Sequence, residues 1–217
     1  MFALQTSDWV DNEDSSDERT LAELWDDLVA GRARVRGSYA SDARQYLEVE
    51  AASARALTNS QVALLERLLL GQPMKVIAFE AERALSSVSA QVQQITAGLG
   101  FQGGVRALPA ALFGLVLCVK GRTRAADLDW RLSAAPEDGV RIYSMSRCDL
   151  VLPKSLARSE CQVLRRLLDG SSYATIGRER GRSERTIANQ LASVYRKLGV
   201  SGRTELLGHL LQRGRPV

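Results

Sequence analysis

Ser183 to Val200, SERTIANQLASVYRKLGV, is the stretch that decides the fold of this 217-residue chain. Its large apolar residues recur at spacings of four, three and four, which is typical of one buried stripe along a helix. They are Ile187, Leu191, Val194 and Leu198. The opposite face is polar and carries Arg185, Asn189 and Arg196. Further polar residues lie at the edges of this face: Thr186, Gln190, Ser193 and Lys197. The stretch therefore predicts a helix that buries one side and presents amide and guanidinium groups on the other.

A shorter helix is expected just before this one, from Tyr173 to Arg180, with Gly181 in the tight bend and Ser183 as the cap of the second helix. The pair predicts a helix-turn-helix. Amide groups match adenine and guanidinium groups match guanine in the major groove, so we predict double-stranded DNA as the partner. The predicted DNA-binding residues are Arg182, Ser183, Arg185, Thr186, Asn189, Gln190, Ser193, Arg196, Lys197 and Arg203.

The segment LARSECQVLRRLLDGSSYATIGRERGRSERTIANQLASVYRKLGVSGRTELLGHLL resembles the LuxR/NarL-type DNA-binding domain. That family's pattern is filled by Glu160, Gly170, Ile176, Ser183, Thr186, Ile187, Lys197, Leu198, Gly199 and Val200. Two positions depart from it: Gln190 stands where the family usually has His, and Ala157 where it has the Thr that caps the first helix. The resemblance implies a domain of four helices, in which the fourth helix forms the dimer contact.

An internal repeat lies upstream of this domain. Leu57 to Leu108 aligns without a gap on Leu156 to Leu207 at an offset of 99, with fifteen identical pairs. The upstream copy keeps a capping box, Thr58 with Gln61. Its outer face lacks basic groups, and its net charge is +1, against +5 for the downstream copy. We therefore favour a degenerate copy kept for packing or pairing over a second reading head, whose contacts would be Ser87, Gln91 and Gln94.

The predicted fold class is mainly α with two β-hairpins (α+β), built from two tandem helix-turn-helix units of four helices, each preceded by a hairpin. Residues 1–19 are expected to be an acidic disordered tail, and residues 20–56 a helix, capped by Thr20, plus a hairpin with strands at 33–39 and 44–50. The degenerate LuxR-like unit spans 57–120, the second hairpin 121–155, and the DNA-binding LuxR-type unit 156–217. The second hairpin is expected to pair 126–134 with 140–152 through a turn at 136–139.

Pro109 opens a strongly apolar segment, PAALFGLVLCVKG, at the place of the fourth helix of the first copy. Because it is apolar nearly all round, it must be buried. It packs inside the chain, pairs with the helix expected at Thr204 to Arg213, or meets the same segment of a second chain. We favour a homodimer, with Leu112, Leu115, Val116, Leu117 and Val119 as its contacts.

Charge is unevenly distributed along the chain, whose net charge is +4. Residues 1–28 hold nine acidic residues against Arg19, and residues 156–207 hold ten basic residues against five acidic ones. A basic module gains affinity for DNA by releasing counterions from phosphates. The acidic start of the chain is expected to compete with phosphates for the basic face, to offer a surface to RNA polymerase or another regulator, or to be only a solvated tail.

Several other classes are disfavoured. No apolar run reaches about 18 residues and no signal core is visible, so we expect a cytoplasmic protein without a membrane segment. Three scattered cysteines and the lone His209 form no metal, disulfide or catalytic set, so no cofactor, no metal and no enzyme activity are expected. The main alternative is a protein-interaction adaptor that has kept a helix-turn-helix shape. A sigma-factor region-four relative is disfavoured because another helix is expected after Lys197 to Val200.

Overall fold

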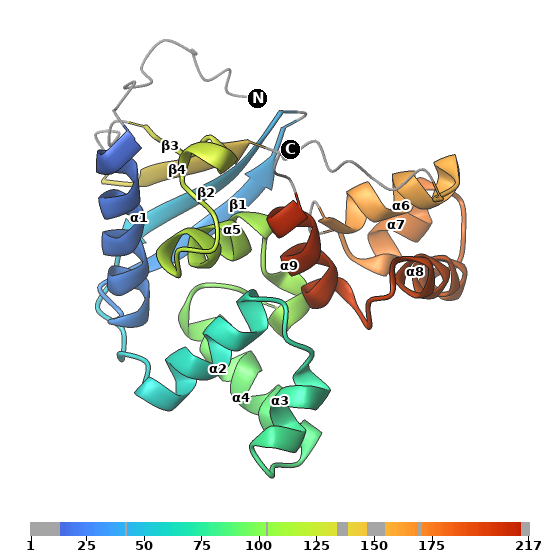
Figure 1. Cartoon of the computed structure of the whole chain (residues 1–217), viewed down its shortest axis with the longest axis horizontal. Coiled ribbons are helices and arrows are strands. Elements are labelled where there is room, and N and C mark those ends of the chain that lie inside the picture. The colour runs from blue at the N-terminus through green and yellow to red at the C-terminus, as the bar shows by residue number, and fades with distance from the viewer. Residues whose placement is uncertain are drawn as a thin grey trace.

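The computed structural model describes residues 14–41, 43–102, 104–133, 139–146, 155–168 and 171–213 (Figure 1). Its first half contains α1 (Asp14–Val29), β1 (Ala33–Ala40), β2 (Arg44–Ala51), α2 (Asn59–Leu69), α3 (Met74–Glu80), α4 (Leu85–Gly98), the 3₁₀ helix η1 (Gly104–Ala107) and α5 (Ala110–Val119). Its second half contains η2 (Ala126–Leu128), β3 (Arg131–Leu132), β4 (Arg141–Ser146), α6 (Arg158–Leu168), α7 (Tyr173–Glu179), α8 (Glu184–Leu198) and α9 (Arg203–Arg213). These helices and the small antiparallel sheet confirm the predicted α+β class.

The strands form one sheet in the order β1-β2-β4-β3. The first predicted hairpin is confirmed, but it does not stand alone, because β2 pairs antiparallel with β4, with Leu47 opposite Tyr143. A hairpin thus precedes each helical unit, as predicted, and the two hairpins meet in one sheet. If the two hairpins stood apart, each would have strand edges with unpaired backbone N–H and C=O groups. Pairing β2 with β4 satisfies these groups on one edge of each hairpin.

The first strand of the second hairpin is shorter than the predicted range of 126–134. Residues 126–128 form η2, and Arg131 and Leu132 pair with β4, followed by Ser133, whose backbone N–H donates to the carbonyl oxygen of Ile142 at 2.9 Å. The residues predicted for most of its turn, 136–138, and for the end of its second strand, 147–152, lie outside the described part of the chain.

Helix α1 begins at Asp14, six residues before the predicted start at Thr20. The prediction of disorder for residues 14–19 is therefore wrong, while residues 1–13 lie outside the described part. The helix begins within the acidic segment of the sequence, and negative charge near a helix start is favoured by the helix dipole. An acidic segment can thus extend the helix that buries Leu24 and Trp25.

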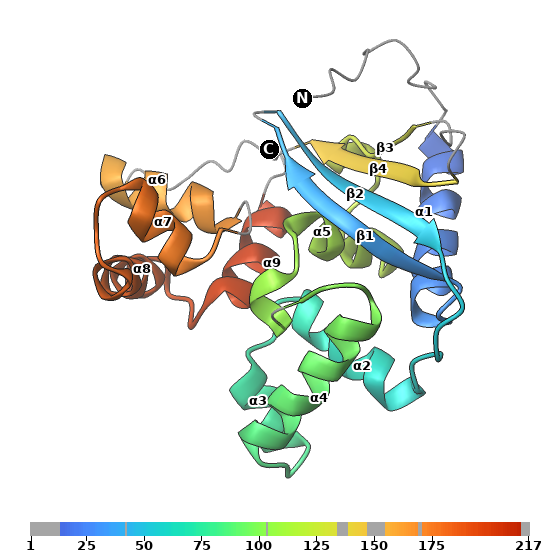
Figure 2. The same cartoon turned by 180° about the vertical axis from the view of Figure 1, so that it is seen from behind.

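Helix α5 lies at the centre of the molecule. Together with α1 it covers one face of the sheet, while no described helix covers the other face (Figures 1 and 2). Helices α2 and α9 also pack against α5. The side chains expected to form a contact between two chains are buried here: Leu112, Leu115, Val116 and Leu117 are 0% exposed, and Val119 is half-buried. The predicted homodimer contact through these residues is therefore wrong, because α5 meets α9 of its own chain.

The 99-residue offset of the sequence repeat also relates the helix bounds. Helices α2 and α3 begin and end 99 residues before α6 and α7, and α4 begins 99 residues before α8. The turns agree as well, since Gly181 has a φ of 60° and Glu82, at the equivalent position, a φ of 51°. Residues other than glycine rarely adopt a positive φ, because the Cβ atom approaches the backbone. Glu82 is thus held in a conformation that suits glycine.

We expect Glu82→Gly to stabilise the protein by about 1 kcal/mol, or to raise the Tm by about 2–4 °C, because it relieves this backbone strain. The converse change, Gly181→Glu, should destabilise it by about 1–2 kcal/mol, since nothing surrounds Gly181 and only its φ is at issue. Thermal unfolding followed by circular dichroism measures both. A Tm lowered by Glu82→Gly would contradict the strain at this turn.

A glycine pair lets α9 lie against the junction of α2 and α3. A Cβ atom added to Gly208 would lie 2.9 Å from the Cα of Gly71 and 3.1 Å from the carbonyl oxygen of Leu70. Both neighbours are backbone atoms, which cannot rotate away as a side chain can. The contact therefore requires glycine at position 208.

Gly208→Ala should destabilise the protein by about 1–3 kcal/mol, because the helix must move away from this junction. Gly98→Ala is the matched control, since Gly98 is also helical and has open space around its Cα. Replacing glycine by alanine in a helix should leave the stability equal or slightly higher. Urea denaturation of the two variants compares them, and equal midpoints would show that the contact is not tight.

Candidate nucleic-acid interface

Local signals in the sequence set the bounds of α8. The Ser183 hydroxyl accepts a hydrogen bond from the backbone N–H of Thr186 at 3.1 Å, as the cap predicted for this residue. Gly199 ends the helix with a φ of 67°. The predicted stripe is buried, with Ile187, Leu191 and Val194 at 0% exposure.

The preceding helix α7 packs closely against the turn that leads into α8. Ser172 caps α7 by accepting from the backbone N–H of Thr175 at 3.1 Å. A Cβ atom added to Gly177 would lie 2.7 Å from the carbonyl oxygen of Arg182, so glycine allows this approach. The two helices and their turn form a helix-turn-helix, as predicted.

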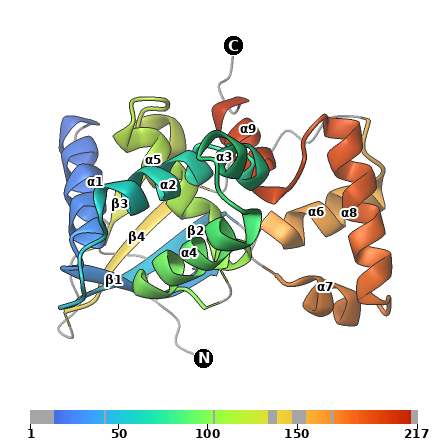
Figure 3. The same cartoon turned by 90° about the horizontal axis from the view of Figure 1, so that it is seen from below.

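The outer face of α8 remains accessible. Helix α8 lies at the end of the molecule away from α1 (Figures 1 and 3). Arg182, Ser183, Arg185, Asn189 and Arg196 are exposed, and Thr186, Gln190 and Ser193 are half-buried. Among the residues that the structure describes, no carboxylate forms an ion pair with Arg185 or Arg196. These guanidinium groups can therefore reach an external phosphate or base.

Lys197 differs from these arginines because it is already paired. Its Nζ donates to both carboxylate oxygens of Glu160, at 2.8 and 2.7 Å, and the Ser193 hydroxyl donates to Oε1 at 3.4 Å. Glu160 Oε2 also accepts from the backbone N–H of Ala157 at 2.8 Å, which satisfies a helix end where the side-chain cap is missing. Glu160 thus links α6 to α8 through its ion pair with Lys197.

This pairing changes the properties of both partners. The hydrogen bond from Lys197, followed by the one from Ala157, holds the pKa of Glu160 below its ordinary value. The charge of Lys197 is compensated, so it contributes less to phosphate binding than its position suggests. The function of Glu160 was missed in the sequence, although both residues stand at positions of the LuxR/NarL-type pattern.

Arg203 does not belong to the exposed surface. It is 9% exposed, and its guanidinium donates to the carbonyl oxygens of Leu167 and Val105, at 3.3 and 3.4 Å. Burial lowers its pKa to about 10. The sequence-based assignment of Arg203 to DNA is corrected accordingly, because this side chain joins α9 to the end of α6 and to η1.

The second set of predicted contacts lies on α4, apart from α8 (Figures 1 and 3). Ser87 and Gln94 are exposed, whereas Gln91 is half-buried and accepts from Arg83 at 2.7 Å. The structure does not bring these residues together with the outer face of α8.

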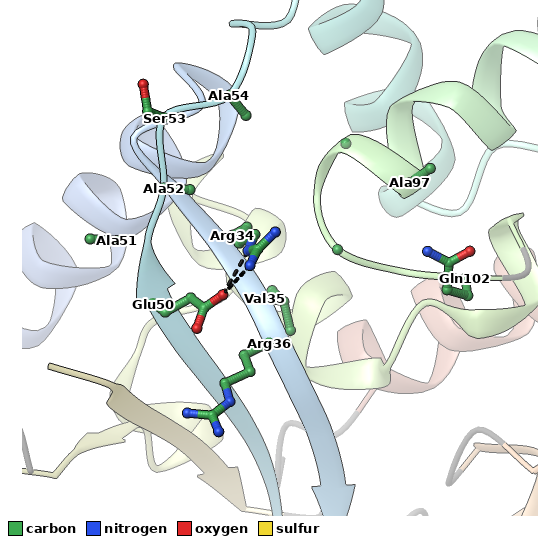
Figure 4. Close-up of a pocket in the computed structure, with 12 residues that line it drawn as sticks. Arg34, Val35, Arg36, Glu50, Ala51, Ala52, Ser53, Ala54, Ala97 and Gln102 are labelled. Atoms are coloured by element: carbon green, nitrogen blue, oxygen red, sulfur yellow. Dashed lines mark hydrogen bonds and ion pairs between the residues drawn. The ribbon is translucent and has the colours of Figure 1, made fainter. Parts of the chain in front are cut away.

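A cavity of about 570 Å³ opens between β1 and the end of α4 (Figure 4). Arg34 and Arg36 line it from the strand, and the Arg34 guanidinium lies 2.6 Å from the Glu50 carboxylate. On the helix side the wall includes Ala97 and Gly98, which stand at the positions of Arg196 and Lys197 in the downstream copy. Small residues at the end of α4 thus leave open space where α8 carries long cations.

Residues 154–210 match the GerE family, described as bacterial regulatory proteins, luxR family. No curated protein and no solved structure matched the chain. The matched segment covers α6 to α8 and most of α9, and it shows that this part of the chain is a LuxR-family helix-turn-helix domain, which supports a DNA-binding transcription regulator. Within the described residues, every helix is too short or too polar to cross a membrane.

Glu160→Gln should destabilise the protein by about 1–2 kcal/mol at neutral pH, because the ion pair with Lys197 is lost. A carboxyl group with a lowered pKa contributes stability above its unfolded-state pKa and loses it on acidification. The difference between wild type and variant should therefore shrink as the pH falls from neutral to about 3. Urea denaturation over this range measures it, with Glu184→Gln, an exposed glutamate of α8, as control. A difference that does not depend on pH would contradict the pairing.

Proposed function

We propose that the chain is a sequence-specific transcription regulator that reads the major groove of DNA with α8. The observation that carries this proposal is the outer face of α8, where Arg185, Asn189 and Arg196 are exposed opposite the buried stripe. A protein of this kind acts where the DNA lies, which agrees with the predicted cytoplasmic location.

The side chains of this face divide between two tasks. Guanidinium groups neutralise phosphates irrespective of sequence, and they also bind the two acceptors of guanine. The amide of Asn189 matches adenine. Gln190 contributes less than its type suggests, since its Oε1 is enclosed and has no hydrogen-bond partner among the described residues. We therefore assign base recognition chiefly to Arg185 and Asn189, and phosphate binding to Arg182 and Arg196.

We infer that residues 57–120 are a degenerate second copy of the same unit. The identical helix starts and the shared positive φ in the turn support this interpretation. Its reading face is neutral, with Ser86, Ala90 and Ala97 exposed on α4. Such a face offers neither cations for phosphate nor a set of groups for base edges, so its contribution is to packing and pairing.

A protein partner is supported by a separate surface. Glu18, Glu23 and Asp26 are exposed along α1, at the far end of the molecule from α8. An acidic helix at this place is suited to contact with RNA polymerase or another regulator. A chain that bound a protein partner through this surface and did not bind DNA would be a protein-interaction adaptor. Gel-shift titrations distinguish such an adaptor from a DNA-binding regulator.

Gel-shift titrations against genomic fragments, followed by titrations of one selected site at several salt concentrations, test the proposal. Arg196→Ala should weaken binding to all sequences and reduce the salt slope by about one. Asn189→Ala should instead cost about 1–3 kcal/mol at particular bases. Arg122→Ala, an exposed arginine outside the downstream unit, is the control for net charge and should change neither.

The triple variant Arg185→Ala, Asn189→Ala and Arg196→Ala provides the decisive comparison. Its selected-site binding should fall to the level of an unrelated duplex, while its helical circular dichroism stays as in wild type, because these side chains are exposed. Binding as tight as that of the wild type would exclude α8 as the reading helix.

A further inference from the structure

An exposed apolar surface lies on the turn between α3 and α4 of the upstream copy, and we refer to Val76, Phe79 and Leu85 as the apolar tip. Phe79 is 84% exposed, Leu85 42% and Val76 39%. Of the four large hydrophobic side chains that are exposed in the described part of the chain, these are three, and the fourth, Tyr39, lies on the sheet. Two further exposed alanines, Ala81 and Ala84, lie in the turn between them. The exposed hydrophobic side chains are thus concentrated at one place.

The downstream copy has polar residues at the three equivalent positions, Thr175, Arg178 and Glu184. The two copies share their turn geometry, so the backbone does not require apolar side chains here. Leaving a phenylalanine in water forgoes the favourable free energy that its burial would contribute. A concentration of such residues on a soluble surface marks a place that another surface covers.

The adjoining face of α4 is suited to close contact. Ser86, Ser87 and Ala90, in the first half of α4, are exposed, small and uncharged. Small side chains let another helix approach closely, and the neutral face requires no charged group to be desolvated. Lys75 and Glu82, which are both exposed, flank the apolar tip with opposite charges.

We propose that the apolar tip is the contact through which two copies of this chain form a homodimer. In a two-fold arrangement the same patch faces itself, so it must be self-complementary. The tip meets this condition, because each copy offers both a cation and a carboxylate at its border. The basic downstream unit does not meet it, since two such faces repel each other.

The packing of α9 within the chain also supports the apolar tip as the dimer contact. The fourth helix of the downstream copy, α9, lies against α5 and α2, with Leu206 and Leu207 at 0% and 1% exposure. That helix is therefore covered within the chain and does not offer its apolar side to a second copy. The apolar tip lies apart from α8 (Figures 1 and 3), so both reading helices stay accessible in such a dimer.

The need for two reading helices on one duplex rests on the proposed function. A regulator with a single reading helix makes few phosphate contacts and binds weakly at physiological salt, whereas a dimer places two heads on one duplex. The exposed apolar tip is independent of that function. The association is therefore measured without DNA, so that it and the proposed function can fail separately.

Sedimentation velocity over a wide range of concentration tests the homodimer. The wild-type chain should sediment increasingly as a dimer as its concentration rises. Phe79→Glu should raise the dissociation constant of the dimer by about tenfold or more, because it places like charges at the centre of the contact. Leu85→Glu should act in the same direction. Since these side chains are exposed, both variants should keep the circular dichroism spectrum of the wild type.

Tyr39→Glu is the matched control, because it introduces the same charge at the exposed hydrophobic residue on the sheet. This variant should dimerise as the wild type does. A wild-type chain that stays monomeric at all concentrations overturns the inference, even if it binds DNA. Dimers that persist in Phe79→Glu place the contact elsewhere and also overturn it. The inference is also overturned if Tyr39→Glu disrupts the dimer as strongly as Phe79→Glu does.

Discussion

The burial of α5 is the constraint on which the rest of the structure depends. A helix that is apolar on every side can be stable only if other elements surround it. The sheet and α1 cover one part of its surface, and α2 and α9 cover another. Two glycines bring the layers close enough: a Cβ atom on Gly114 would lie 2.7 Å from the Met145 sulfur, and one on Gly208 would lie 2.9 Å from Gly71. One short helix thereby joins segments that are far apart in the sequence.

The downstream helix-turn-helix unit depends on this centre for its position. Helix α9 belongs to the downstream unit but packs on α5, and the buried Arg203 links it to α6 and η1. Within the unit, Glu160 fixes α6 to α8 through Lys197. The outer face of α8 takes part in neither contact. Rigid packing on one side and free cations on the other are what a groove-reading helix needs, because a positioned side chain loses less entropy on binding.

The two helical units show how a shared backbone can carry different surfaces. Their helices start at equivalent positions, yet Arg196 and Lys197 of one correspond to Ala97 and Gly98 of the other. Small residues in place of long cations remove positive charge from the end of α4, and Gly100 lets the chain approach the sheet, because a Cβ atom there would lie 2.0 Å from the carbonyl oxygen of Val35. Here the backbone N–H of Val35 donates to the carbonyl oxygen of Leu99 at 2.9 Å. The end of α4 is thus neutral and bonded to a strand, whereas the equivalent end of α8 carries exposed cations.

The sequence alone determined the caps, turns and buried stripe of α8, the first hairpin and the α+β class, because these depend on periodicity and on hydrogen bonds between near neighbours. Only the tertiary structure decided what covers α5, whether the hairpins share a sheet, and which cations of the downstream unit stay free. Lys197 meets Glu160 across 37 positions and Arg203 meets Val105 across 98. Periodicity shows that a face must be buried or that a charge is present, but the partner is set by how distant elements pack.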